Sequence, residues 1–213
     1  VGSGDVYKRQ EVKCGAPAPS VEALKKLGYT HILMATGAWQ AGELGIPGNV
    51  KGVIGWMKEM KQQVKPCLEG HVVVVGAGNT AMDAARVAKR MGAASSTIVY
   101  RRTKKEMPAD EHELALALAD GVEFAELAAP IKQADGVLQC EKMVLGEADA
   151  SGRRSPVGSG EFFTVPCDLV ISAVGEQVDD ALMAANGIEL DKKGRPAFQT
   201  LSLIHISEPT RPY

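Results

Sequence analysis

The chain has 213 residues, a length typical of one domain or two small ones. Hydrophobic residues make up 45% and charged residues 23%, which excludes a disordered chain, a collagen and a coiled coil. The net charge of −2 offers no basic surface for nucleic acid, and the apolar runs are far shorter than the roughly 20 residues of a membrane span. We therefore expect a globular protein without a nucleic-acid partner or a membrane span.

The cysteines and histidines lack the spacing of a metal site. Cys14, Cys67, Cys140 and Cys167 form no Cys-x-x-Cys pair, which excludes a sequence-visible zinc ribbon, redox dithiol or ferredoxin-type cluster. The histidines show no metal-ligand spacing either, so we expect no metal site. A disulfide scaffold is not expected at this size, and the cysteines favour a reducing, cytoplasmic location.

Both ends of the chain differ from its middle. Residues 1–10 and 201–213 resemble translated sequencing-adapter DNA, so we predict two non-native segments flanking a native part at about 11–200. The alternative is a pair of ordinary frayed termini.

The pattern of apolar and turn residues predicts helices and strands in alternation. In chain order these are a helix over 21–27, a strand over 30–35, a helix over 53–60, a strand over 71–75, a helix over 79–91, a strand over 97–100, a helix over 109–120, a strand over 168–173 and a helix over 179–185. Between 122 and 165, short extended segments broken by glycines predict an antiparallel meander. The unit at 71–100 has the length of a parallel βαβ crossover, so we predict an α/β, Rossmann-like fold with a parallel sheet plus this meander.

A glycine-rich turn lies between the strand at 71–75 and the following helix. The residues that match G-x-G-x-x-A are Gly76, Ala77, Gly78, Asn79, Thr80 and Ala81. The strand before and the helix after satisfy the context of a dinucleotide site, in which the glycines allow a tight turn and the helix N-terminus binds the pyrophosphate. The alternative is a purely structural turn.

Two arginines follow the next strand and indicate which dinucleotide binds. An NAD site places an acid there for the ribose hydroxyls, whereas an NADP site places arginine near the 2′-phosphate. This chain has Arg101 and Arg102, with no acid before Glu106. A guanidinium binds phosphate in a bidentate manner, so the sequence predicts NADPH, with a solvated basic loop as the alternative. No catalytic Ser/His/Asp or Cys/His arrangement is present, and we predict no catalytic side chain.

Three further stretches give the sequence a family likeness. Residues 76–86, 99–103 and 106–109 resemble the small subunit of NADPH-dependent glutamate synthase and its relatives, which are flavoproteins with an NADPH domain inserted in an FAD domain. Residues 140–154 and 173–176 bring the chain nearest to the selenate reductase flavoprotein subunit within that family.

The resemblance implies a domain division and further cofactor contacts. It assigns 11–50 and 176–200 to an incomplete FAD domain and 51–175 to the NAD(P)H domain. Thr36 and Gly37 would end the first FAD segment, and Ala173 and Gly175 would end the NADPH domain close to a cofactor. The family's first glycine motif, its later Gly-Asp and its iron–sulfur cysteines have no counterpart in this sequence.

The resemblance also implies an activity. NADPH would pass hydride to FAD, and electrons would leave through iron–sulfur centres of the parent protein to an electron-accepting subunit or domain. We expect the chain alone to be inactive. A flavin-free NADP-dependent dehydrogenase and a non-catalytic nucleotide-binding module are the alternatives, and the terminal electron acceptor cannot be read from this sequence.

Overall fold

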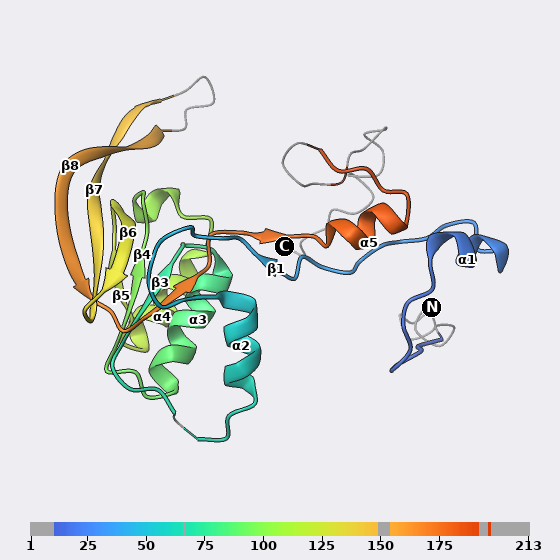
Figure 1. Ribbon diagram of the computed structural model, residues 1–213, viewed down its shortest axis with the longest axis horizontal. Helices are drawn as coiled ribbons and strands as arrows, with labels where there is room; N and C mark the ends of the chain where they lie inside the picture. Colours follow the sequence, from blue (N-terminus) through green and yellow to red (C-terminus); the bar gives the residue numbers. More distant parts are fainter. Residues whose placement is uncertain (1–10, 66, 149–153, 192–195, 197–213) are drawn as a thin grey trace, which may run out of the picture. The chain divides into compact units, whose positions relative to one another are not determined.

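The computed structural model describes residues 11–65, 67–148, 154–191 and 196 (Figure 1). The chain divides into a larger unit, Ala38–Val178, and a smaller unit formed by the segments before and after it. The larger unit contains the whole of the predicted 51–175 domain, while the assignment of each segment to a cofactor stays a prediction. The segments 1–10 and 201–213, predicted to be non-native, lie outside the described residues.

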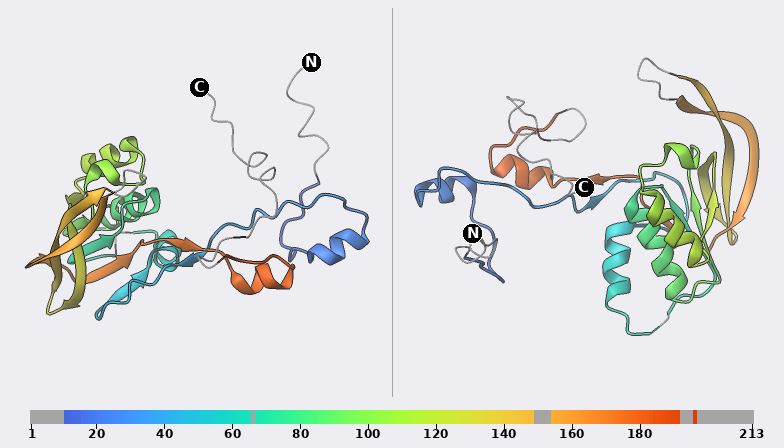
Figure 2. Two further views of the ribbon diagram at one scale, coloured as in Figure 1. Left: turned by 90° about the horizontal axis from the view of Figure 1, so that it is seen from above. Right: turned by 180° about the vertical axis from the view of Figure 1, so that it is seen from behind.

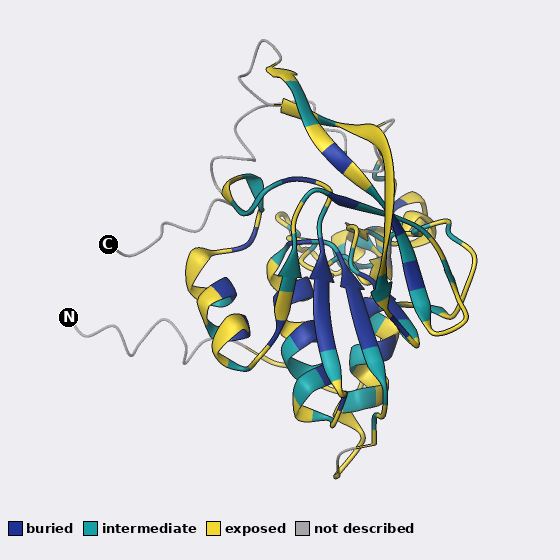
Figure 3. Ribbon diagram, turned by 90° about the vertical axis from the view of Figure 1, so that its left-hand side faces the viewer, coloured by how far each residue is buried: buried dark blue, intermediate teal, exposed yellow. Residues whose placement is uncertain are grey.

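A five-stranded parallel sheet forms the centre of the larger unit, as the sequence predicts. Its strands, in spatial order, are β2 (Val50–Gly52), β9 (Leu169–Ser172), β3 (His71–Val75), β4 (Ser95–Val99) and β5 (Glu123–Ala125). Val74 lies beside Ile98 of β4 and Ile171 of β9, so β3 is hydrogen-bonded on both sides. The strands nearest the middle of the sheet are the most buried (Figure 3), as is typical of parallel strands covered on both faces.

Successive side chains of β3 serve two different cores. Val72 and Val74 pack in a cluster with residues of three helices, α2 (Val53–Lys61), α3 (Asn79–Arg90) and α4 (Glu111–Ala119). Val73 and Val75 pack in a second cluster with residues of an antiparallel sheet. Because side chains alternate along a strand, the helices and the antiparallel sheet cover opposite faces of the parallel sheet (Figures 1 and 2). None of the helices in the described part is long and apolar enough to cross a membrane.

The antiparallel sheet confirms most of the predicted meander. It consists of β6 (Ala128–Ala134), β7 (Val137–Ala148) and β8 (Arg154–Pro166), in that order. The prediction is wrong at its start, because β5 at Glu123–Ala125 joins the parallel sheet beside β4. The helix α4 returns the chain to the same end of the sheet, so β5 completes a second parallel crossover. The ring of Phe124 then packs edge-on against Tyr100, with 6.5 Å between the ring centroids.

Two short segments that no sequence pattern predicts connect the beginning and the end of the larger unit. The strand β1 (Gln40–Ala41) pairs antiparallel with β10 (Glu176–Gln177). The N–H of Gly42 donates a hydrogen bond to the carbonyl of Gly175 over 2.8 Å, which extends this ribbon. The ribbon fixes the backbone that leaves β9, where part of the candidate site lies.

In the part of the smaller unit that the structure describes there are two helices, both predicted. In α1 (Val21–Lys26) the Ser20 hydroxyl accepts a hydrogen bond from the N–H of Ala23, as expected of an N-cap. The helix α5 (Asp180–Ala185) begins after Asp179, whose carboxylate accepts from the N–H of Leu182. These two segments are joined by the Val21 N–H, which donates to Asn186 Oδ1 over 2.8 Å.

The strand predicted over 30–35 does not form. These residues lie in a bend and irregular backbone, and Leu33 keeps 85% of its surface exposed. A strand requires a neighbour that pairs with its N–H and C=O groups, and no strand of the described residues pairs with this segment. The apolar pattern therefore marks a potential strand without a partner to stabilise it.

The four cysteines are free thiols and fall into two classes. Cys14 and Cys67 are exposed, whereas Cys140 and Cys167 are buried between the two sheets. Burial raises the pKa of the Cys140 thiol to about 12 and that of Cys167 to about 11. Since the thiolate is the reactive form, the buried pair is chemically inert near neutral pH.

We predict two distinct rates of thiol modification. At pH 8 a chromogenic disulfide reagent should titrate Cys14 and Cys67 rapidly, and Cys140 and Cys167 only after urea is added. The raised pKa values also make the folded state hold its thiol protons at a pH where the unfolded chain, with thiol pKa near 8.5, has lost them. The stability of the folded state should therefore fall as the pH rises from about 9 towards 12. Four equally fast thiols in the native protein would contradict this burial.

Candidate functional site

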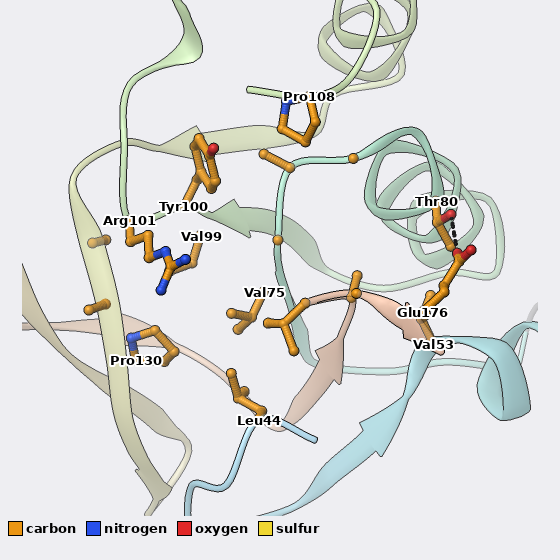
Figure 4. A pocket seen from close by; sticks show the side chains of 18 residues that line it. Leu44, Val53, Val75, Thr80, Val99, Tyr100, Arg101, Pro108, Pro130 and Glu176 are labelled. Carbon is orange, nitrogen blue, oxygen red and sulfur yellow. Dashed lines mark hydrogen bonds between the residues drawn. The ribbon is translucent and has the colours of Figure 1, made fainter. Parts of the chain in front are cut away.

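A cavity of about 570 Å³ opens at the carboxyl ends of β3, β4 and β9 (Figure 4). Its lining residues are Leu44, Val53, Val75, Gly76, Ala77, Gly78, Thr80, Val99, Tyr100, Arg101, Pro108, Ala128, Ala129, Pro130, Ala173, Val174, Gly175 and Glu176. The chain proceeds from β3 to β4 and β5 on one side, and returns to β9 on the other side of β3. The cavity therefore lies at the point where the strand order reverses, which is where open parallel sheets bind ligands.

Two glycines of the turn after β3 have different structural requirements. Gly76 has a φ of +133°, and a Cβ atom there would collide with the carbonyl oxygen of Ala173. Only glycine fits this close approach of β3 and β9. A Cβ at Gly78, by contrast, would meet no atom within 4 Å, although Gly78 lines the cavity. Gly78 is thus dispensable for packing, and the missing side chain leaves room at the N-terminus of α3.

The first turn of α3 presents its N-terminus to the cavity. Gly78 is the N-cap, and the N–H groups of Asn79 and Thr80 precede the first acceptor of the helix, whereas the N–H of Ala81 already donates to the Gly78 carbonyl over 2.9 Å. Thr80 lines the cavity, and its hydroxyl donates to Glu176 Oε1 over 2.7 Å. These N–H groups and the positive end of the helix dipole can bind a phosphate.

The other residues of the glycine motif have packing roles. Ala77 lines the cavity and is buried, and its carbonyl accepts a hydrogen bond from the N–H of Ala109 over 3.0 Å. Ala81 is fully buried in the core and does not line the cavity. Asn79 does not line it either; its side-chain oxygen accepts from the N–H of Asp110, which joins the start of α3 to the start of α4. The small side chains therefore bring the helix close to the sheet.

The structure separates the two arginines that the sequence groups together. Arg101 is exposed and lines the cavity, where Figure 4 shows its side chain beside Pro130. Arg102 is 8% exposed and does not line the cavity; its Nε atom has no hydrogen-bond partner among the described residues. The predicted pair thus contributes one guanidinium to the cavity and buries the other.

Of the remaining predicted site residues, two line the cavity and two do not. Ala173 and Gly175, which follow β9, line the cavity. Thr36 and Gly37 belong to the smaller unit and are not among the lining residues. Among the described residues, no group of three or more His, Cys, Asp or Glu side chains could hold a metal ion.

Sequence reasoning missed the residues that close the cavity from other elements. Leu44 comes from a loop, and Ala128, Ala129 and Pro130 come from β6 in the antiparallel sheet. No local signal places these residues at the site, because only the topology brings β6 over the end of β4. Glu176 could have been found, since it directly follows the predicted Ala173–Gly175 turn.

Comparison with known proteins decides the family. Residues 2–200 match the family described as pyridine nucleotide-disulphide oxidoreductase. The chain belongs to this family. It is 44% identical over 186 residues to YgfK of Escherichia coli (strain K12), covering 85% of this chain and 18% of YgfK. It is 38% identical over 183 residues to the glutamate synthase (NADPH) small chain of Azospirillum brasilense, covering 76% of this chain and 38% of that one.

These relatives confirm the predicted likeness to glutamate synthase small subunits, while the narrower likeness to a selenate reductase subunit stays a prediction. The chain spans less than two fifths of either relative's length. Among solved structures, Mycobacterium tuberculosis FprA in complex with NADPH superposes with a TM-score of 0.58 at 19% identity, covering 75% of this chain and 52% of that one. This likeness confirms the predicted fold class.

Proposed function

We propose that the chain is the NADPH-binding part of an oxidoreductase that passes electrons from NADPH to FAD. The observation that carries the proposal is the cavity at the reversal of strand order, with the N-terminus of α3 and the guanidinium of Arg101 both facing it. Family membership and the glutamate synthase (NADPH) small chain among the relatives support the same conclusion.

The residues present fit an NADPH molecule. The open space at Gly78 and the N-terminus of α3 would take the pyrophosphate, and Arg101 at the end of β4 would take the 2′-phosphate. Tyr100 and Pro108 would flank the adenosine half, and Ala173–Gly175 would line the path of the other half. When bound, NADPH supplies a hydride; the side chains described here bind and orient the cofactor, and none of them is required as an acid or a base.

The other parts of the proposal concern the parent protein. The segments 11–50 and 176–200, with Thr36 and Gly37, would belong to an FAD domain, and the iron–sulfur clusters and the electron-accepting partner would lie elsewhere in the assembly. The name of the relative from Azospirillum brasilense, a small chain, supports a partner subunit. A cytoplasmic location is supported by the four free cysteines.

Nucleotide titration tests the proposal. We expect the protein to bind NADPH more tightly than NADH. Arg101→Ala should remove about 1.5–3 kcal/mol of that preference, the contribution of one charge-assisted hydrogen bond, which is roughly 10- to 150-fold in Kd. Arg102→Ala tests whether the buried guanidinium also contributes to the preference, as the sequence predicts.

A matched arginine serves as the control for this titration. Arg90, the last residue of α3, is exposed and does not line the cavity, and its guanidinium is paired with the carboxylate of Asp120, which follows α4. Arg90→Ala should leave the ratio of the two Kd values unchanged. Equal affinity of the unmodified protein for NADPH and NADH would refute the assignment to NADP.

A further inference from the structure

The cavity contains two charged side chains, of opposite sign, at separate ends. Of its lining residues, only Arg101 and Glu176 carry a formal charge. Figure 4 shows them on opposite sides, with Arg101 near Pro130 and Glu176 beside Thr80. The remaining lining consists of apolar side chains, glycines, one threonine and one tyrosine. A ligand that complements this site therefore carries negative charge at one end and positive charge at the other.

The order of the strands indicates which part of a dinucleotide meets each charge. Arg101 follows β4, the glycine turn follows β3, and Glu176 follows β9, and these strands are neighbours in the order β4, β3, β9. With the 2′-phosphate at β4 and the pyrophosphate at the N-terminus of α3, the cofactor continues towards β9. The nicotinamide half is then the half that approaches Glu176.

The carboxylate of Glu176 is held in place by the protein. The Thr80 hydroxyl donates to Oε1 over 2.7 Å, and Glu176 lies in the β1–β10 ribbon, paired with Ala41. The adjacent carbonyl of Gly175 accepts from the N–H of Gly42. The backbone on both sides of the carboxylate is therefore fixed before any ligand binds.

We infer that Glu176 sets the preference of this site between the two redox states of its nucleotide, by favouring the cationic nicotinamide ring of NADP⁺ over the neutral ring of NADPH. The inference rests on the proposed function. Both forms share the phosphates and the adenosine, so the interactions of Arg101 and the α3 N-terminus contribute equally to each. A carboxylate on the nicotinamide half attracts only the form whose ring carries a positive charge.

The test compares three ligands that differ only at the nicotinamide end: NADP⁺, NADPH and 2′-phospho-ADP-ribose, which has no ring. Glu176→Gln keeps the acceptor for the Thr80 hydroxyl and removes the charge. It should weaken NADP⁺ relative to the other two ligands roughly two- to fivefold, the range for a solvent-exposed ion pair, and change the Kd values of those two ligands by one common factor. Glu176→Asp, which keeps the charge, should retain most of the NADP⁺ affinity.

The control is a second glutamate that accepts from a threonine. Glu123 Oε2 accepts from the Thr97 hydroxyl over 3.3 Å and does not line the cavity, so Glu123→Gln should change none of the three Kd values. An equal change for all three ligands in Glu176→Gln would place the carboxylate at the pyrophosphate and overturn the inference, as would no change for any ligand. If the unmodified protein binds none of the ligands, the proposed function fails and takes this inference with it.

Discussion

Replacing Gly78 with alanine is expected to abolish tight NADPH binding while leaving the fold intact. The Cβ atom would enter space that holds no protein atom within 4 Å, directly at the N-terminus of α3. A pyrophosphate could then no longer approach the backbone N–H groups closely. Losing two charge-assisted hydrogen bonds costs about 3–6 kcal/mol, which is a loss of more than roughly 100-fold in affinity.

The neighbouring Gly76 should respond in the opposite manner. Here an alanine Cβ collides with the carbonyl oxygen of Ala173, and the φ of +133° is strained for any residue with a side chain. Backbone strain and overpacking each cost about 1–3 kcal/mol, so Gly76→Ala should lower the free energy of unfolding by about 2–6 kcal/mol. Gly78 has a φ of −86°, which alanine adopts without strain.

Urea unfolding and NADPH titration of the two variants distinguish these roles. Gly78→Ala should unfold at nearly the same urea concentration as the unmodified protein and fail to bind, whereas Gly76→Ala should be destabilised. Unimpaired NADPH binding by Gly78→Ala would place the pyrophosphate elsewhere. For Gly76→Ala the midpoint of urea unfolding is the decisive measurement. An unchanged midpoint would contradict the close approach of β3 and β9.

The sequence predicts the helices and central strands well because their signals are local. The unit from β3 to β4 combines β-branched residues, a glycine turn and an alanine-rich helix, and each part agrees with the others. The segment 30–35 has an equally apolar pattern, but no strand in the described part of the chain pairs with it. The prediction places β5 in the antiparallel sheet and is wrong there, because the sequence of a three-residue strand does not reveal which neighbour it joins.

The candidate site was predictable where it follows a strand and invisible where it depends on topology. Gly76, Gly78 and Arg101 could be placed because parallel strands all present their carboxyl ends at one edge. The sequence could not distinguish Arg101 from Arg102, since neighbouring residues at a strand end differ only in the direction that tertiary packing gives them. Pro130 comes from the opposite sheet, and no spacing along the chain indicates its place.

Replacing Trp56 with alanine is expected to cause a large loss of stability. Trp56 is 1% exposed and lies on α2, where it joins the cluster that includes Met82 and Ile98. Truncating a buried tryptophan removes its transfer free energy and leaves a cavity that the close-packed core refills only in part. We expect the free energy of unfolding to fall by about 3–5 kcal/mol, measured by urea denaturation followed by circular dichroism.

The second tryptophan provides the matched control for this loss. Trp39 is 72% exposed, so Trp39→Ala removes the same side chain from a position that is mostly in water. Exposed substitutions change stability by about 0.5 kcal/mol or less, so the two variants should differ by several kcal/mol. In Trp39→Phe the tryptophan fluorescence comes from Trp56 alone, and its emission should shift to longer wavelength in the same urea transition that circular dichroism detects. Equal losses in Trp56→Ala and Trp39→Ala would show that α2 does not pack on the parallel sheet through Trp56. That result would remove α2 from the layer of helices that covers the sheet beneath the cavity.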